Sequence, residues 1–429
     1  MGKPVLVIGT LDTKEKEIIY LRKRIEAAGL RVLFLDVSCK TQKPATPVEI
    51  SCEAVAGEDG KTFAEISQLD KISAVRIMSA GAAKKVLKMV AQEEFYGMIA
   101  MGGGNGTEIA TYVMRQLPVG FPKIMVSCVA SGNVRPYVGT KDIIMVYSIG
   151  DISLNRITKR IINNAVLALR GMVSEKVETE EEEEKPQICI STFAVTLPCV
   201  ERARNLLHEK GFEVIELHAS GSGGMALEEL VRSGEISGVL DITASEVVNE
   251  LLGGIYSAGP HRLEAAGATG VPQVISLGAY DFANFGSKET IPEKYKGRNF
   301  FFYTPSITLM RTNVEENNLF GKVIANKLNK SCGPTALLVP RNGFSALDRE
   351  GSGRHKMSLD GTIRGEWYDP GADLALIDSL KQHLDPSRVL LQEVDFHIND
   401  PQFAEIAVKL LCRLMQTSGK QKVREKKAL

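Results

Sequence analysis

One stretch of the chain, residues 97–107, constrains the fold more than any other. It reads Gly-Met-Ile-Ala-Met-Gly-Gly-Gly-Asn-Gly-Thr, and a helical pattern of apolar residues follows it. A buried strand, a glycine-rich turn and a helix in this order direct backbone N–H groups and a helix N-terminus at an anion. Glycines suit the turn because a side chain would hold the backbone away from a phosphate. The stretch therefore predicts a phosphate-bearing ligand, although it matches neither G-x-G-x-x-G nor G-x-x-x-x-G-K-[ST].

Short apolar runs alternate with helical patterns over residues 1–173. The runs lie at 5–10, 32–37, 97–101, 123–129 and 143–149, with helical patterns near 77–93, 105–117 and 154–172. Such alternation is typical of the α/β class, with an open, mostly parallel sheet and helices on both faces. We expect residues 1–173 to form one Rossmann-like domain.

The segment 174–186 interrupts this pattern. It is rich in glutamate, has no apolar residue after Val177 and ends in Lys185-Pro186. These features predict an exposed linker, and a regulatory acidic tract is the alternative interpretation.

The strand and helix pattern restarts after the linker. Four pairs of residues lie the same distance apart in the two halves, namely Ile8 and Ile190, Thr10 and Thr192, Gly29 and Gly211, and Val32 and Val214. This weak duplication predicts a second Rossmann-like domain over 187–418. Its further strands are expected at 238–242, 273–277, 300–304, 335–339 and 389–396. A last helix near 401–416 and a basic, frayed tail at 419–429 complete the prediction.

Composition excludes several classes of protein. Lys+Arg and Asp+Glu both number 52, so nothing in the net charge favours nucleic acid or a membrane surface as a partner. No apolar run approaches the roughly 18 residues that a membrane span needs. The seven cysteines are scattered, and no signal peptide pattern precedes the first strand. Both observations lead us to expect a cytoplasmic protein with reduced thiols.

Small and polar residues follow several strands of the first domain, where open α/β sheets bind ligands. The predicted nucleotide contacts are Asp12, Thr13, Lys14, Gly102, Gly103, Gly104, Asn105, Gly106, Thr107, Val129, Ala130, Ser131 and Gly132. Helix capping by Asp12 and tight packing of the small residues are the plainer alternatives. Several such turns at the ends of one sheet nevertheless favour nucleotide or phosphate binding.

The second half repeats this arrangement and predicts a second polar ligand facing the first domain. The candidate residues are Ser220, Gly221, Gly223, Gly224, Asp241, Thr243, Glu246, Arg311, Ser345, Asp348 and His397. Glycine-rich turns also occur without ligands, Arg311 can equally form an ion pair, and His397 can equally cap a helix. No G-x-S-x-G, H-E-x-x-H or EF-hand pattern is present, so no hydrolase triad and no protein-held metal site is predicted.

These stretches together resemble the bacterial and plant family that includes the N-terminal, ATP-binding domain of the tomato resistance protein against tomato mosaic virus. The matching stretches are 8–14, 102–107, 129–132, 137–140, 198–200, 238–243, 284–286, 309–312, 345–348 and 397–400. The resemblance implies two Rossmann-like domains, ATP bound by the first domain, and a homodimer. It also implies nucleotide contacts at residues 12–14, 102–107 and 129–132. The plant pattern has Gly where this chain has Asn105, and Ser where it has Gly104, so individual contacts are expected to differ.

Three functional hypotheses follow. The first is a cytoplasmic ATP-binding protein acting as an ATP-dependent enzyme on a small molecule in the interdomain cleft, with Mg²⁺ as an optional companion of ATP. The second is a non-catalytic, nucleotide-dependent sensor or interaction protein. The third and least favoured is a small-molecule kinase of the Gly-Gly-Asp-Gly-Thr type, because Asn105 stands where the catalytic Asp would be.

Overall fold

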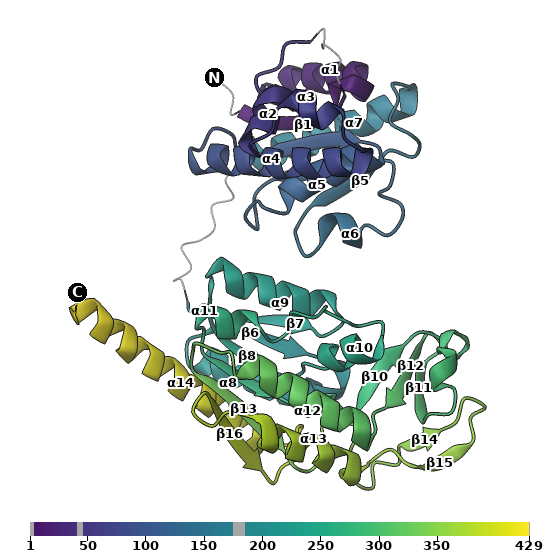
Figure 1. Cartoon of the computed structure of the whole chain (residues 1–429), viewed down its shortest axis with the longest axis vertical. Helices are drawn as coiled ribbons and strands as arrows, with labels where there is room; N and C mark the ends of the chain where they lie inside the picture. The colour runs from purple at the N-terminus through teal and green to yellow at the C-terminus, as the bar shows by residue number, and fades with distance from the viewer. Residues whose placement is uncertain (1–3, 41–45, 175–184, 429) are drawn as a thin grey trace. The chain divides into compact units, whose positions relative to one another are not determined.

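The computed structural model describes residues 4–40, 46–174 and 185–428, with side chains up to residue 417 (Figure 1). Contacts between Cα atoms divide the chain into two compact units, 1–182 and 183–429. Most of the segment predicted as an acidic linker, residues 175–184, lies outside the described residues. No helix in the described part of the chain has the length and apolarity needed to cross a membrane.

The N-terminal unit is built on a five-stranded parallel sheet with the order β2-β1-β3-β4-β5. Its strands are β1 (Pro4–Gly9), β2 (Arg31–Asp36), β3 (Met98–Gly102), β4 (Lys123–Ser127) and β5 (Ile144–Tyr147). Every residue of β1, β3 and β4 is buried, as expected for parallel strands that are covered on both faces. The apolar runs seen in the sequence are therefore the centre of this sheet.

Helices cover both faces of this sheet (Figure 1). They are α1 (Leu11–Ala27), α2 (Cys52–Glu58), α3 (Phe63–Ser67), α4 (Lys71–Ala91), α5 (Gly104–Met114), α6 (Arg135–Val138) and α7 (Arg156–Ser174). Alternate strand residues point to opposite faces. Val5 and Val7 pack with α1 and α7, whereas Leu6 and Ile8 pack with α2, α3, α4 and α5.

The C-terminal unit contains a six-stranded parallel sheet with the order β16-β13-β9-β8-β6-β7. Its strands are β6 (Gln187–Thr192), β7 (Glu213–His218), β8 (Ile236–Asp241), β9 (Gln273–Ser276), β13 (Thr335–Pro340) and β16 (Val389–Val394). The helices of this unit are α8 (Leu197–Glu209), α9 (Ser222–Ser233), α10 (Glu246–Leu252), α11 (Ala265–Thr269), α12 (Val314–Leu328), α13 (Pro370–His383) and α14 (Pro401–Ala428). Short 3₁₀ helices are η1 (Ala194–Thr196), η2 (Lys288–Thr290) and η3 (Glu293–Tyr295). The final helix continues well beyond 416, so the backbone of the predicted frayed tail is helical up to residue 428.

A second sheet of the C-terminal unit was not foreseen from the sequence. It is antiparallel along β10-β12-β11-β14-β15 and is formed by β10 (Phe282–Phe285), β11 (Phe300–Thr304), β12 (Ile307–Arg311), β14 (His355–Met357) and β15 (Ile363–Glu366). The strand predicted at 300–304 therefore lies outside the parallel sheet. The reason is the short connection between β11 and β12, because parallel neighbours need a much longer crossover.

The two parallel sheets share one topology. Counted from its own first strand, the second sheet runs 2-1-3-4-5-6 and extends the 2-1-3-4-5 order of the first. Gly29 and Gly211, paired in the sequence, both have left-handed φ values, +84° and +82°, just before the second strand of each sheet. Glycine is favoured there because a Cβ atom would be strained. The duplication predicted from the sequence is thus a duplication of fold.

Candidate functional site

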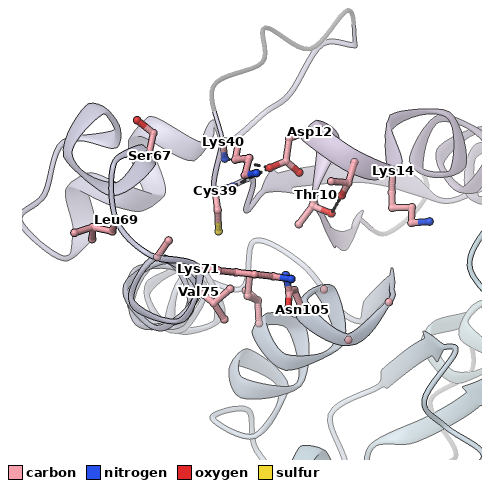
Figure 2. A pocket seen from close by; sticks show the side chains of 16 residues that line it. Thr10, Asp12, Lys14, Cys39, Lys40, Ser67, Leu69, Lys71, Val75 and Asn105 are labelled. Carbon is pink, nitrogen blue, oxygen red and sulfur yellow. Dashed lines mark hydrogen bonds between the residues drawn. The ribbon is translucent and has the colours of Figure 1, made fainter.

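A pocket of about 660 Å³ lies in the N-terminal unit at the carboxyl ends of β1, β2 and β3 (Figure 2). The chain leaves β1 for β2 on one side and later returns to place β3 on the other side. Open α/β sheets bind ligands next to the carboxyl ends of the strands, at the point where the strand order reverses in this way. The volume also lies within the roughly 300–1,000 Å³ of small-molecule pockets.

The glycine-rich turn forms one wall of this pocket with exposed backbone. Helix α5 begins at Gly104, and its N-cap residue, Gly103, has no side chain to cap it. Within the described residues, the N–H groups of Gly104, Asn105 and Gly106 have no hydrogen-bond acceptor, whereas Thr107 N–H donates to Gly103 O at 2.9 Å. A Cβ atom at Gly104 would meet no heavy atom within 4 Å. The turn therefore offers free donors and open space to an anion.

Helix α1 begins at the same edge of the sheet, but its first N–H groups have internal partners. Leu11 N–H donates to Asp36 Oδ1 at 3.3 Å, and Asp12 N–H donates to Ser38 Oγ at 3.1 Å. The Asp12 carboxylate in turn accepts from the N–H groups of Cys39 and Lys40, both at 3.1 Å. Asp12 thereby fixes the segment after β2 against α1.

Three lysines, Lys14, Lys40 and Lys71, line the pocket. Lys71, at the start of α4, points toward Asn105 in Figure 2. Lys14 Nζ donates to Ile152 O at 2.5 Å and lies 3.7 Å from Asp151 Oδ2. Among the described lining residues, Asp12 is the single carboxylate, so positive charge is in excess and an anion is favoured.

An apolar wall completes the pocket. Leu69, Val75 and Ile109 contribute it, from the approach to α4, from α4 and from α5. Figure 2 shows Leu69 and Val75 on the side of the pocket away from Lys14. The pocket thus combines open N–H groups and lysines with an apolar wall.

Two residues of the predicted turn support it from behind and do not line the pocket. A Cβ atom at Gly102 would come within 2.8 Å of Gly106 Cα, so glycine is required there by the turn itself. Thr107 is buried, and its Oγ1 lies 2.8 Å from Gly103 O and 2.7 Å from Ser127 Oγ. These contacts hold the turn against the end of β4.

The stretch Val129–Gly132 follows β4, one strand beyond the switch, and it does not line the pocket. Ser131 and Gly132 are exposed, while Val129 and Ala130 are half-buried. Of the predicted nucleotide contacts, the pocket brings together Asp12, Thr13, Lys14, Gly103, Gly104, Asn105 and Gly106.

In the C-terminal unit, the predicted second-ligand residues after β7 and β8 join a buried ion network. Glu246 Oε1 accepts from the N–H groups of Gly221 and Gly224, at 2.7 and 2.9 Å, at the start of α9. Arg262 donates to Glu246 Oε2 at 2.6 Å and to both carboxylate oxygens of Asp241, at 2.6 and 2.8 Å. The N-terminus of α9, which was predicted to bind an external anion, is therefore occupied by the carboxylate of Glu246.

The neighbouring candidates are also engaged internally. Thr243 is buried, with its Oγ1 at 2.7 Å from Thr196 Oγ1. Gly223 packs directly against the backbone of His218, leaving no room for a side chain. Ser220 Oγ lies 3.4 Å from His218 O. All three residues thus make contacts inside the domain, and they do not form the open ligand cleft that was predicted from the sequence.

Arg311, Ser345, Asp348 and His397 form a second closed network. Arg311 Nη2 donates to Asp348 Oδ1 at 3.1 Å and to Asp373 Oδ1 at 2.8 Å. Ser345 Oγ donates to Asp281 Oδ2 at 2.8 Å. Burial raises the pKa of Asp281 to about 7, with Asp348 adding to the shift and Arg311 opposing it.

His397 is held in one orientation within this network. Its Nε2 lies 2.9 Å from Ser345 O, and its Nδ1 accepts from Asn399 N–H at 3.1 Å. Burial lowers the pKa of His397, which favours the neutral ring. These contacts indicate a structural role at the start of α14.

Two family models together cover almost all of the chain. The N-terminal domain model of the uncharacterised protein family UPF0261 matches residues 3–178, and the C-terminal domain model of the same family matches residues 185–415. The chain belongs to the UPF0261 family. The membership confirms the resemblance inferred from the sequence.

Relatives match over nearly the whole length of this UPF0261 chain. A UPF0261 protein of Clostridium tetani is 42% identical over 97% of this chain and 100% of its own length. UPF0261 protein RA0729 of Rhizobium meliloti is 42% identical over 95% of this chain and 98% of its own. The ToMV resistance protein Tm-1(GCR237) of Solanum lycopersicum is 34% identical over 94% of this chain, which corresponds to 55% of the tomato protein.

Solved structures resemble the UPF0261 chain only distantly. A crystal structure of UDP-N-acetylglucosamine 2-epimerase aligns at 6% identity over 64% of this chain and 79% of its own, with a TM-score of 0.24. At this score the likeness carries no argument about function.

Sequence reasoning missed several residues of the UPF0261 pocket and its counterpart. Lys40, Leu69 and Lys71 lie outside the turns that directly follow β1 and β3. Arg262 and Glu228, which complete the buried network of the C-terminal unit, stand in no motif. Lys71 had one local signal, since it follows Asp70, whose carboxylate accepts from the first N–H groups of α4.

Proposed function

We propose that the N-terminal domain of this UPF0261 protein binds a nucleotide, and that the nucleotide is ATP. The observation that carries the proposal is the open turn at Gly104–Gly106, whose N–H groups lack acceptors among the described residues and face a pocket with excess lysine. Backbone donors at a helix N-terminus favour phosphate because they match both its charge and its acceptor oxygens.

Each part of the pocket suits one part of ATP. The N–H groups of the turn would hold phosphate oxygens, and Lys14, Lys40 and Lys71 would neutralise their charge. Leu69 and Val75 would contact the base, because an apolar wall favours a flat, weakly polar ring. Since Mg²⁺ reaches nucleotides through phosphate and one or two carboxylates, Asp12 would share such an ion, because it is the single carboxylate among the described lining residues.

Two uses of the nucleotide remain as proposals, an ATP-dependent reaction on a small molecule and a non-catalytic sensor. The state of Asp12 favours the sensor, because this carboxylate already accepts two backbone N–H bonds that fix residues 39 and 40. Measurement of phosphate release during incubation with ATP separates the two: sustained release supports the enzyme, and binding without release supports the sensor.

The binding proposal is tested by calorimetric titration of the full chain with ATP, with and without Mg²⁺. Gly104→Val should weaken ATP binding about tenfold or more, because the new side chain enters the open space over the turn. Gly171→Val is the matched control, since Gly171 lies in α7, also has no heavy atom within 4 Å of its Cβ position, and does not line the pocket. Absence of ATP binding at millimolar concentration, or equal affinity of the Gly104→Val variant, would overturn the proposal.

A further inference from the structure

A second pocket, of about 180 Å³, lies entirely within the C-terminal unit. Phe193, Ala194 and Val195 line it directly after β6, and His218 lines it at the end of β7. Strand β6 is the first strand of its sheet and lies beside the switch in strand order, as β1 does in the N-terminal sheet. The pocket therefore occupies a position where α/β sheets bind ligands.

Aromatic rings dominate this pocket. Phe193 is buried, and its ring centroid lies 5.1 Å from that of His218 and 6.0 Å from that of Tyr256. Tyr303, from β11 of the antiparallel sheet, adds a fourth ring that is 46% exposed. Leu309 of β12 is buried and also lines the pocket. Rings at these separations offer faces and edges on which another ring can stack.

No Asp, Glu, Lys or Arg is among the described residues that line this pocket. Burial lowers the pKa of His218, so its ring is favoured in the neutral form. A charged ligand would therefore lose hydration without gaining an ionic partner.

One buried amide contributes to the wall of the pocket. Asn284 is 1% exposed and contributes to the wall, and its Oδ1 accepts from Asn249 Nδ2 at 3.2 Å. Its own Nδ2 has no hydrogen-bond partner among the described residues. This Nδ2 atom is itself buried, so the amide adds little accessible polar surface to the pocket.

We propose that this aromatic pocket of the C-terminal domain binds an uncharged aromatic molecule with a single ring. The size follows from the volume, since an apolar cavity of about 150 Å³ holds one benzene-sized ring. A nucleotide is far larger than this, so the site is distinct from the one proposed for ATP and goes beyond it.

The test uses the full chain with carbon-13 labels on alanine, isoleucine and leucine methyl groups, and acetophenone as the probe. Titration should shift the methyl signals of Ala194, Ile307 and Leu309, which all line the pocket, with a dissociation constant of about 1 mM for so small a ligand. Cyclohexyl methyl ketone, which keeps the carbonyl and loses the aromatic ring, should bind about fivefold more weakly. Phenyltrimethylammonium, a cation of similar size, should also bind more weakly.

Two variants locate the binding site. Tyr303→Ala removes an exposed ring of the pocket and should weaken acetophenone binding about fivefold. Ile363→Ala is the control, because Ile363 is 62% exposed on β15, at the edge of the same antiparallel sheet, and does not line the pocket. The proposal is overturned if the three methyl signals stay unshifted at 10 mM probe, if the saturated ketone or the cation binds as well as acetophenone, or if Tyr303→Ala and Ile363→Ala have the same affinity.

Discussion

The two domains share a strand order but use a helix N-terminus that follows a strand of the parallel sheet in opposite ways. After the third strand of the first sheet, α5 begins with Gly104, and its first N–H groups are open to the pocket. After the third strand of the second sheet, α10 begins with Glu246, whose carboxylate occupies the N-terminus of α9. One domain leaves the N–H groups of such a helix N-terminus open, and the other domain fills it with a carboxylate of its own. Fold position alone therefore does not identify a ligand site.

The largest expected effect comes from breaking the internal site. Arg262→Met removes the cation that Asp241 and Glu246 share, and it leaves buried carboxylates without their ionic partner. The free energy of unfolding of the C-terminal domain should fall by about 3–5 kcal/mol. Denaturant unfolding followed by the fluorescence of Trp367, the single tryptophan, measures this loss.

Arg232→Met provides the control for this change. Arg232 is 50% exposed and lies 3.5 Å from Glu228 of the same network. Its removal should cost less than about 1 kcal/mol, because exposed ion pairs contribute little. Equal effects of the two substitutions would contradict the view that the buried network replaces a ligand.

The second prediction concerns pH, because buried carboxylates gather in the C-terminal domain. Asp281 has a pKa of about 7 in the fold against an ordinary value of 3.8, so the folded state binds the extra proton between these values. The free energy of unfolding should therefore fall as pH rises from about 4 to 7, with a slope on the order of 1 kcal/mol per pH unit from this group.

Asp281→Asn isolates the contribution of that group. The variant keeps an oxygen for the donors of Ser345 and Trp367 and cannot ionise. Its stability should vary less with pH than that of the parent over the same range, as measured by Trp367 fluorescence. Parallel curves for variant and parent would show that Asp281 does not titrate there.

The third prediction sharpens the open site. Lys71→Met should weaken ATP binding about threefold to tenfold, and added salt should reduce the difference, because an exposed charge acts over a screened distance. Lys88→Met, at the far end of α4 and paired with Glu58, should leave the affinity unchanged. Calorimetric titration at two ionic strengths compares them, and equal losses would remove Lys71 from the site.

The smallest effect is expected at Asn105. Asn105→Asp places a negative charge at the start of α5 beside the proposed phosphates, so ATP affinity should fall about threefold. Glu108→Gln is a useful comparison, because it removes an exposed charge one turn further along the same helix. Phosphate transfer by the Asn105→Asp variant, in place of weaker binding, would instead support the kinase hypothesis.

Much of the fold could be predicted because its signals are local. The strands of both parallel sheets appear as apolar runs, and the spacing of Gly29 and Gly211 marks the duplication. Helices α2 and α3 were missed, although the Thr62–Glu65 capping box that opens α3 is a readable signal. The antiparallel sheet was missed because it joins β10, the β11–β12 pair and the β14–β15 pair, which come from three separate segments of the chain.

The predicted site residues likewise include some whose role could be inferred from local sequence and others whose role could not. The turn at residues 103–106 was predictable because glycines and a following helix are adjacent in sequence. The contact of Glu246 with the N-terminus of α9 was not predictable, because it joins residues 25 positions apart and depends on Arg262. His397 likewise carries no sequence mark that separates a structural ring from a catalytic one.

The hydroxyl contact between Thr107 and Ser127 has a consequence for how a ligand would enter. It fixes the turn after β3 to β4, which is fully buried. The N–H groups of the turn are therefore held in place before a ligand binds. A preorganised receptor of this kind spends little conformational entropy on association. Ligand binding at this turn should then resemble docking to a rigid surface. Its association rate should be limited by diffusional encounter, and its heat-capacity change should be the one expected from the surface that is buried.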